Sequence, residues 1–296
     1  MFELLYYIRQ WPGTIQQRVT RIVHTLFLEI KRFLTGQKYI AEFDLSDECN
    51  LRCNHCYHFR GEKQFEEVPI EEWERVFKKQ YKNGIRRVLL IGGEPAMRMD
   101  VVELANKTFS YIDICSNGTI RIPDWYKQKI FVSIDGNKET HDEVRGEGVY
   151  DKVINNYHDD KRVVISMTVS EHNWEQMEDV IKLAIKNNLF GVSCDVYTPS
   201  PVDFQKDALF VTPQIRKKII NEMYRLKKKY PYMFFMSNSA IRWFEKENHK
   251  NKPCYWKMAV KHFDTKLQER PSCKNLDCSN CGHFAQANLS PLDFLL

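Results

Sequence analysis

Hydrophobic residues near the amino terminus recur at intervals of three and four positions. Between residues 14 and 34 this spacing predicts a helix with one apolar stripe, made by Ile15, Val19, Ile22, Leu26, Ile30 and Phe33. Thr14 is the expected cap and Gly36 the expected stop. Basic residues lie off the stripe, at Arg18, Arg21, Lys31 and Arg32. Such a helix either packs against the body of the protein or lies on a membrane surface, and the sequence leaves both interpretations open.

From residue 39 to about residue 200, short runs rich in β-branched residues alternate with helical patterns. Strands are predicted at residues 40–45, 87–91, 111–115, 130–134, 163–169 and 192–197. This alternation indicates a parallel sheet with helices outside it. Six such units predict an α/β fold of the partial (β/α)6 TIM-barrel type, in which functional side chains gather at the carboxyl ends of the strands.

The patterns divide the chain into four successive parts. They are an amino-terminal amphipathic helix in residues 1–38, the barrel in 39–200, a helical and strand continuation in 201–250, and a cysteine-rich tail in 251–296. Two prolines at positions 199 and 201 mark the end of the barrel.

Composition excludes several classes of protein. Of the 296 residues, 43% are hydrophobic and 28% are charged, as in an ordinary globular protein. The net charge of +5 is spread along the chain, so we expect no nucleic-acid partner. The chain has no secretion signal pattern and no apolar run of roughly 18 residues, so a cytoplasmic protein is expected.

Nine cysteines are the unusual feature of the composition, and seven of them fall into two tight groups. In a protein that is not secreted, clustered cysteines favour metal ligation over disulfides. The two isolated cysteines, Cys115 and Cys194, lie in predicted strands and are interpreted as small buried hydrophobic residues.

The first group, Cys49, Cys53 and Cys56, follows directly after the first predicted strand. Three thiolates can bind three irons of one [4Fe–4S] cluster and leave the fourth iron open to a substrate or cofactor. Zinc is the alternative on residue types, with His55 or His58 as the fourth ligand. The position after the first strand of a βα series favours the cluster.

Further candidate ligand-binding residues follow the later strands. Gly92 and Gly93, next to Pro95, would let the backbone approach a ligand closely. Glu94 can accept a hydrogen bond from an ammonium group at the same edge. Ser133 at the end of the fourth strand and Arg145 beyond it are candidates for contact with a ligand carboxylate, Arg145 as a bidentate fork.

In their spacing and order these motifs resemble those of the radical S-adenosylmethionine (SAM) superfamily. The resemblance rests on C-x3-C-x2-C at 49–56, GGEP at 92–95, SNGT at 116–119, SIDG at 133–136 and HD…RG at 141–146. It covers residues 40 to 200 and resumes in the tail. It implies that Cys49, Cys53 and Cys56 bind the catalytic cluster, and that SAM is bound by Gly92, Gly93, Glu94, Pro95, Asn117, Ser133 and Arg145.

The same resemblance implies an activity. The reduced cluster would cleave SAM to methionine and a 5′-deoxyadenosyl radical, which abstracts hydrogen from the substrate. It also implies a flavodoxin-like or ferredoxin-like electron donor and an anoxic or reducing cytoplasm, since oxygen destroys an open-iron cluster. No catalytic acid or base is assigned.

The second cysteine group consists of Cys254, Cys273, Cys278 and Cys281. Four thiolates complete either one closed [4Fe–4S] cluster or one structural zinc site. The spacing resembles that of the auxiliary-cluster extensions called SPASM and twitch, with Gln268 where their pattern has glycine. We therefore expect one auxiliary cluster at most, and zinc stays open as the alternative.

Three functions from different classes remain. The preferred one is a radical SAM oxidoreductase that matures a peptide or protein. The second is a radical SAM enzyme acting on a lipid or small apolar substrate at the membrane surface, suggested by the helix at residues 14–34 and by a loose likeness to radical enzymes of hopanoid synthesis. The third is a non-catalytic iron–sulfur or zinc binding module, which would release no 5′-deoxyadenosine from SAM.

Overall fold

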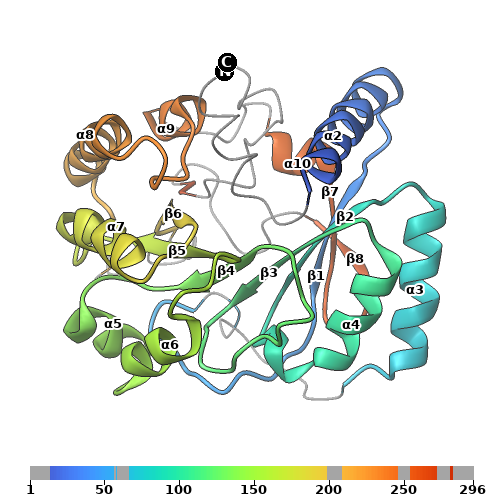
Figure 1. Cartoon of the computed structure of the whole chain (residues 1–296), viewed down its shortest axis with the longest axis horizontal. Coiled ribbons are helices and arrows are strands. Elements are labelled where there is room, and N and C mark those ends of the chain that lie inside the picture. The colour runs from blue at the N-terminus through green and yellow to red at the C-terminus, as the bar shows by residue number, and fades with distance from the viewer. Residues whose placement is uncertain are drawn as a thin grey trace.

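The computed structural model describes residues 14–56, 58, 67–198, 209–245, 254–271 and 281–282. Within them the strands form one sheet in the order β6-β5-β4-β3-β2-β1-β7-β8 (Figure 1). All neighbouring strands are parallel except β7 and β8. The strands are β1 (Ile40–Asp44), β2 (Arg87–Ile91), β3 (Tyr111–Ser116), β4 (Ile130–Ser133), β5 (Val163–Val169), β6 (Gly191–Val196), β7 (Val260–Phe263) and β8 (Glu269–Arg270).

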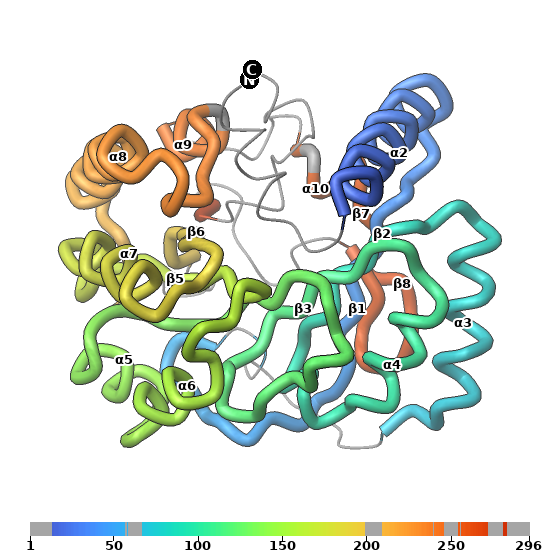
Figure 2. Tube along the Cα trace, in the orientation of Figure 1, coloured from blue at the N-terminus to red at the C-terminus, as the bar shows by residue number. Residues whose placement is uncertain are grey.

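Helices between the barrel strands cover the outer face of the curved, open sheet (Figure 2). α2 and α10 instead pack on the inner face, where Leu28 and Trp256 cluster with Ile40. The helices are α2 (Ile15–Thr35), α3 (Ile70–Lys82), α4 (Met99–Thr108), α5 (Lys138–Arg145), α6 (Val149–Tyr157), α7 (Met177–Lys186), α8 (Pro213–Lys229), α9 (Asn238–Glu245) and α10 (Tyr255–Ala259), with 3-10 turns η1 (Pro95–Met97) and η2 (Trp174–Gln176). Among the described residues, no helix is both long and apolar enough to cross a membrane.

The alternation of side chains along β1 distinguishes the outer face of the sheet, which is covered by α3, from its inner face. Phe43 packs edge-on against Trp73 and Phe77 of α3, with ring centroids 6.0 and 5.0 Å away. Phe43 therefore points outward into the helix layer. Glu42 and Asp44, which alternate with it, point to the inner face of the sheet.

The fold class expected from the sequence is confirmed. The six predicted strands exist, with ends that differ from the prediction by a single residue at most. Two strands extend the sheet beyond the six predicted for the barrel. β7 pairs in parallel with the free side of β1, from Ile40 opposite Val260 to Phe43 opposite Phe263, and β8 pairs with β7. The sheet is thus wider than the six predicted units, although it remains open.

The edge of the sheet at β6 is occupied by two segments from the carboxyl-terminal third of the chain. The amide of Val192 donates to the carbonyl of Met233, and the amide of Phe235 donates to the carbonyl of Val192, each at 2.7 Å. Nearer the carboxyl end of β6, the amide of Val196 donates to the carbonyl of Gly282 at 2.9 Å. These bonds satisfy backbone groups that an exposed edge strand would leave open.

α2 begins at Thr14, whose side chain and that of Gln17 form a capping box, and ends at Gly36 with φ +69°. Glycine adopts this left-handed conformation without steric cost. The helix predicted for residues 14–34 is therefore confirmed, together with both of its end signals.

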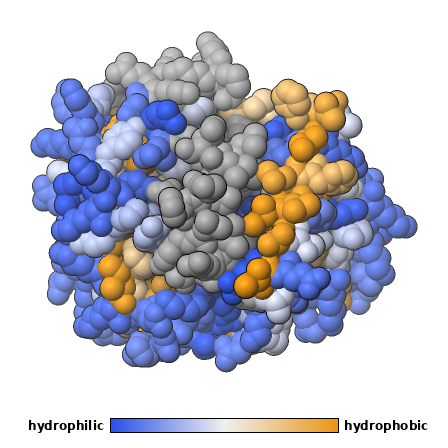
Figure 3. Space-filling model, turned by 45° about the horizontal axis from the view of Figure 1, so that its top comes forward, coloured by the Kyte–Doolittle hydropathy of each residue, from blue (hydrophilic) through white to orange (hydrophobic). Residues whose placement is uncertain are grey.

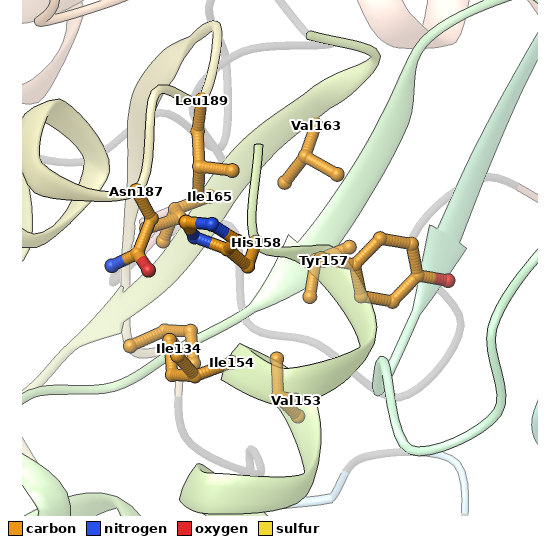
Figure 4. A pocket seen from close by; sticks show the side chains of 10 residues that line it. Ile134, Val153, Ile154, Tyr157, His158, Val163, Ile165, Asn187 and Leu189 are labelled. Carbon is orange, nitrogen blue, oxygen red and sulfur yellow. The ribbon is translucent and has the colours of Figure 1, made fainter. Parts of the chain in front are cut away.

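A small cavity lies between α6 and the outer face of β4 and β5 (Figure 4). Its volume is about 10 Å³, and Ile134, Val153 and Ile165 are among its apolar lining residues. A space of this size holds one water at most. It is a packing defect in the helix layer, separate from the loops described next.

Candidate active site

Cys49, Cys53 and Cys56 lie on the loop that follows β1, and all three are partly exposed. The loop is folded by its own backbone, since the amide of Cys56 donates to the carbonyl of Cys53 at 3.1 Å. The Sγ atom of Cys49 accepts a hydrogen bond from the amide of Leu51 at 3.4 Å. The predicted first cysteine group is thus presented at the carboxyl ends of the strands.

A cluster and a zinc site make different demands on these thiols. In the described part of the chain, no three His, Cys, Asp or Glu side chains are placed to hold a single metal ion. Zinc needs four ligands on one ion, whereas a [4Fe–4S] cluster binds each cysteine through a different iron. A cluster needs only these three cysteines, and zinc with His55 or His58 as a further ligand stays the alternative.

The loop after β2 packs directly on the cysteine loop. Gly93 has φ +56°, and a Cβ atom there would lie 2.0 Å from the carbonyl oxygen of Glu48. The amide of Glu94 donates to the same carbonyl at 2.9 Å. Gly92, with φ +80°, would place a Cβ 2.7 Å from the backbone of Asp44. Both glycines are required because backbone meets backbone at this junction.

Glu94 is fully buried and joins two loops. One carboxylate oxygen accepts hydrogen bonds from the amide of Ala96 at 2.9 Å and the hydroxyl of Ser116 at 2.8 Å. The other oxygen accepts from the amide of Asn117 at 2.7 Å. A carboxylate has about four acceptor positions, so one remains for a further donor. Burial raises the pKa of Glu94, and these hydrogen bonds act against that shift.

Asn117, which the sequence places in the SAM-binding set, contacts the cysteine loop in the structure. Its Nδ2 atom donates to Asn50 Oδ1 at 2.8 Å and lies 3.7 Å from Cys49 Sγ. Its Oδ1 atom accepts from the amide and the hydroxyl of Thr119. Burial raises the pKa of the Cys49 thiol, while hydrogen bonds from Leu51 and Asn117 favour the thiolate that a metal requires.

Arg145 is the last residue of α5 and lies beside the cysteine loop. Its Nε atom donates to Asp135 at 2.6 Å, and its Nη1 atom lies 3.9 Å from Cys53 Sγ. Burial lowers the pKa of Arg145, but the charges of Asp135 and Cys53 outweigh it and leave the pKa raised. Its shortest contact is thus with a protein carboxylate, and the expected contact of Arg145 with a ligand carboxylate stays a prediction.

Asp135 belongs to the SIDG motif, but the sequence analysis gave it no role. It is buried directly after β4 and also accepts from the amide of Thr168 at 3.0 Å. Burial alone would raise its pKa, but Arg145 and His55 outweigh burial and lower the pKa to about 2. Asp135 therefore stays ionised and fixes Arg145 near the thiols. A carboxylate at the carboxyl end of a strand was the available signal.

Two further histidines lie around Asp135. His55 Nε2 is 3.6 Å from the carboxylate of Asp135, and His141 Nδ1 accepts from the backbone amide of Asp135 at 3.2 Å. Burial and the nearby charge of Arg145 lower the pKa of His141 to about 4, so it is neutral. Of the remaining candidates, Ser133 ends β4 beside Ser166 of β5, and Pro95 opens η1.

A charged cluster lines the inner face of β1, β7 and β8. Glu42 Oε1 contacts His262 Nδ1 at 2.9 Å and accepts from Arg270 at 3.0 Å. Arg270 also donates to Asp44, at 3.1 Å. Asp44 adjoins Gly92, so this polar wall continues the candidate SAM site into the sheet interior. Local sequence patterns could not reveal it, because it depends on the pairing of β7 with β1.

The second cysteine group is described in part. Cys254 caps α10, and the carbonyl of Cys281 accepts from Arg216 of α8 at 2.8 Å. Gly282 donates to Thr198 at 2.8 Å, so the end of the group rests on the end of β6. Cys273 and Cys278 lie outside the described residues, and the four-cysteine site remains a prediction. Of the isolated cysteines, Cys194 is buried as expected and Cys115 is partly exposed.

Comparison with known proteins places this geometry in context. The model of the family described as "Radical SAM superfamily" matches residues 44–208. The sporulation killing factor maturation protein SkfB of Bacillus subtilis is 28% identical over 157 residues, 47% of this chain and 37% of the relative. The Fe-coproporphyrin III synthase of Methanosarcina barkeri is 28% identical over 169 residues, 51% of this chain and 42% of the relative. The chain thus spans less than half the length of these curated relatives.

Solved structures show the same fold. SuiB of Streptococcus suis, bound to precursor peptide SuiA, superposes with a TM-score of 0.62 at 14% identity, covering 86% of this chain and 63% of SuiB. The protein anSMEcpe, with bound AdoMet and a peptide, gives a TM-score of 0.61 at 16% identity, covering 82% of this chain and 78% of anSMEcpe. At these identities the likeness establishes the fold alone.

Proposed function

Because the chain belongs to the radical SAM superfamily, we propose that it is an enzyme that modifies a peptide or protein by abstracting hydrogen from it. The superfamily uses a [4Fe–4S] cluster and SAM. One observation carries the catalytic part of the proposal. The loops after β1, β2 and β3 are bonded to one another around Cys49, through Glu48, Glu94 and Asn117.

The residues of this chain would have the following roles in binding the cluster and SAM. Cys49, Cys53 and Cys56 hold three irons. The remaining acceptor position of Glu94 takes the ammonium group of SAM, and Gly92 and Gly93 let the backbone approach it. When bound, the reduced cluster supplies the electron that cleaves SAM to methionine and the 5′-deoxyadenosyl radical, which removes hydrogen from the substrate.

Two further side chains have separable roles. Ser133, at the end of β4, is the candidate for the carboxylate of SAM. Arg145 is held by Asp135 with its Nη1 atom 3.9 Å from Cys53 Sγ, so its positive charge favours the thiolate form of that cysteine. The Nη2 atom of Arg145 lies 3.4 Å from His55 Nε2, so a ligand carboxylate would bind Arg145 next to this histidine.

The peptide substrate is supported by the relatives. SkfB is a maturation protein, and SuiB binds a precursor peptide. We further propose that Cys254, Cys273, Cys278 and Cys281 hold one auxiliary [4Fe–4S] cluster, with zinc as the alternative. A flavodoxin-like or ferredoxin-like protein would reduce the catalytic cluster in an anoxic, reducing cytoplasm.

The first experiment measures iron, sulfide and zinc in anaerobically reconstituted protein, and then 5′-deoxyadenosine after reduction with SAM. We expect about eight irons, falling to about four in the Cys49/Cys53/Cys56→Ala variant with no 5′-deoxyadenosine formed. About four irons and one zinc would make the tail structural. A wild-type protein that binds no iron, or releases no 5′-deoxyadenosine, contradicts the enzyme proposal.

The second experiment tests the substrate class. The reduced enzyme is incubated with SAM and a pool of peptides deuterated at carbon. Deuterium in the 5′-deoxyadenosine shows that hydrogen was abstracted from a peptide. Transfer of deuterium only from a deuterated lipid extract would favour the lipid alternative and contradict peptide modification.

A further inference from the structure

α2 contacts the body of the protein through its polar face. Arg21 donates to Gln128 at 2.6 Å, and its guanidinium lies 4.7 Å from the centre of the Tyr111 ring. His24 Nδ1 is 2.8 Å from the hydroxyl of Tyr111. Glu29 accepts from the hydroxyl of Tyr39 at 2.5 Å. The inward side of this helix therefore carries charges and hydrogen bonds, with Leu28 as its buried apolar residue.

The opposite face of α2 is apolar and exposed. Seven large side chains there are 50% to 82% exposed: Ile15, Val19, Val23, Phe27, Ile30, Phe33 and Leu34. We call these seven the α2 stripe, and Figure 3 shows it as a continuous hydrophobic band along the helix. Surface helices of globular proteins normally bury such a face. Contiguous exposed apolar patches above a few hundred Å² mark interaction sites.

The charges around the α2 stripe indicate what covers it. α2 has four basic residues and a single acidic one, Glu29. Arg21 lies on the inward side of the helix and Arg32 pairs with Glu29, which leaves Arg18 and Lys31 as the other two basic residues. Past its carboxyl end, a hollow of about 420 Å³ has Lys38, Lys257, Lys261 and Arg270 in its wall, against one carboxylate, that of Glu269. Lys38 donates to the carbonyls of Lys257 and Val260, both at 2.9 Å, which joins the chain after α2 to the segment that carries Lys257.

This charge distribution disfavours a second copy of the chain as the occupant. Pairing two α2 stripes would bring two cationic helices together, and their Glu29 carboxylates are already engaged by Tyr39 and Arg32. An anionic surface has the opposite charge. The sequence before α2 adds Tyr6, Tyr7 and Trp11, residue types that favour the headgroup region of a bilayer.

We propose that α2 is a membrane-docking helix that inserts its stripe into an anionic lipid surface. An interfacial helix has this composition, with Phe, Leu, Ile and Val on one face and basic residues around it. Docking would also fix the orientation of the enzyme. α2 contacts Tyr39, Tyr111 and Gln128, all at the amino ends of strands, whereas the cysteine loop lies at the carboxyl ends.

The test uses flotation of the full-length protein with vesicles, and it needs neither cluster nor SAM. We expect the protein to float with vesicles of phosphatidylglycerol and phosphatidylcholine, and about tenfold less with phosphatidylcholine alone. The double variant Val23→Glu, Phe27→Glu should bind anionic vesicles at least about tenfold more weakly than the wild type. The matched control is Ile185→Glu on α7, where a 47% exposed isoleucine is replaced away from the stripe and binding should be unchanged.

Circular dichroism shows whether each variant is folded. We expect all of them to fold, because the replaced side chains are exposed. Equal flotation of the wild type and the double variant overturns the proposal, as does equal binding to neutral and anionic vesicles. Sedimentation tests the alternative occupant. If the wild type forms dimers that Phe27→Glu dissociates, and does not float with vesicles, the stripe binds a second copy of the chain and the membrane-docking proposal is wrong. Because vesicle binding and 5′-deoxyadenosine formation are measured separately, failure of one leaves the other intact.

Discussion

Single backbone contacts decide how closely the loops of the candidate site approach one another. Gly93 is in van der Waals contact with the loop that carries Cys49, and no side chain fits between them. Gly148, at the start of α6, has a similar positive φ of +75°, but a Cβ atom added there would meet nothing within 4 Å. The two glycines therefore separate the effect of backbone strain from the effect of a clash.

We predict that Gly93→Ala loses most of the iron bound by the first cysteine group, whereas Gly148→Ala keeps it. In both variants an alanine must adopt a left-handed backbone conformation, which destabilises the fold by about 1 kcal/mol. Only Gly93→Ala also places a Cβ 2.0 Å from the carbonyl oxygen of Glu48. Iron per chain after anaerobic reconstitution is the measurement. Equal iron in the two variants would show that the contact between the loops is dispensable.

At Glu94, replacing one carboxylate oxygen is expected to change the stability of the fold. In Glu94→Gln an amide NH2 replaces one acceptor oxygen and faces a donor, because Ala96, Ser116 and Asn117 all donate to this carboxylate. We expect the free energy of unfolding of the cluster-free protein to fall by about 1–3 kcal/mol in urea. Glu103→Gln, at an exposed ion pair on α4, should stay within about 0.5 kcal/mol of wild type.

At the scale of elements, the turn before β5 holds the segment that follows the β3 loop. Asp160 binds Arg162 through both carboxylate oxygens, with its closest contact at 2.6 Å. Arg162 in turn donates to the carbonyls of Pro123 and Tyr126, at 2.7 and 2.6 Å. Burial raises the pKa of Asp160, but the hydrogen bonds from Arg162 outweigh it and leave the pKa below its ordinary value.

A carboxyl group whose pKa is lowered by folding stabilises the fold above its unfolded pKa of about 4, and this contribution is lost as the pH falls further. We predict that Asp160→Asn lowers the free energy of unfolding by about 1–3 kcal/mol at pH 7. The difference from wild type should shrink below about pH 4. Asp124→Asn, at an exposed partner of the same Arg162, is the control. A pH-independent difference would mean that packing, not charge, explains the loss.

The elements of the barrel could be predicted because their signals are local. The strands up to β6 are bounded by helical patterns and by glycine or cysteine motifs a few residues away. β7 could not be predicted, since Val260–Phe263 is only four residues long and pairs with β1, 220 residues away. The sequence predicted an apolar stripe that shares four of its residues with the α2 stripe: Ile15, Val19, Ile30 and Phe33. It did not show that Ile22 and Leu26 are only partly exposed, because periodicity does not show which side of a helix meets the protein.

In the candidate site, too, the features with local sequence signals were predicted and those that depend on distant contacts were not. Its cysteines and glycines were found by spacing. Asp135 was missed because its role depends on Arg145, which approaches it only when α5 folds back on the sheet. The wall of Glu42, His262 and Arg270 depends on strands from opposite ends of the chain, so no local pattern contains it.

At the scale of the whole molecule, Gly282 ties the last cysteine to the barrel. A Cβ atom there would lie 1.7 Å from the carbonyl of Val196. We predict that Gly282→Ala releases the tail and loses the metal of the second cysteine group, about four irons or one zinc, while the first group keeps its iron. Gly36→Ala, where a Cβ meets nothing within 4 Å, is the control. Full metal content in Gly282→Ala would show that the second group assembles independently of β6.

The length of the strands determines how far the two ends of the sheet lie from each other, and α2 and the cysteine loop lie at opposite ends. Strands of five to seven residues, such as β1 and β5, span roughly 17–23 Å. α2 lies at the amino ends of these strands and the cysteine loop at their carboxyl ends. With α2 docked on lipid as proposed, the sheet would separate the cysteine loop from the membrane, and a peptide substrate and a reductant would reach that loop from the aqueous side.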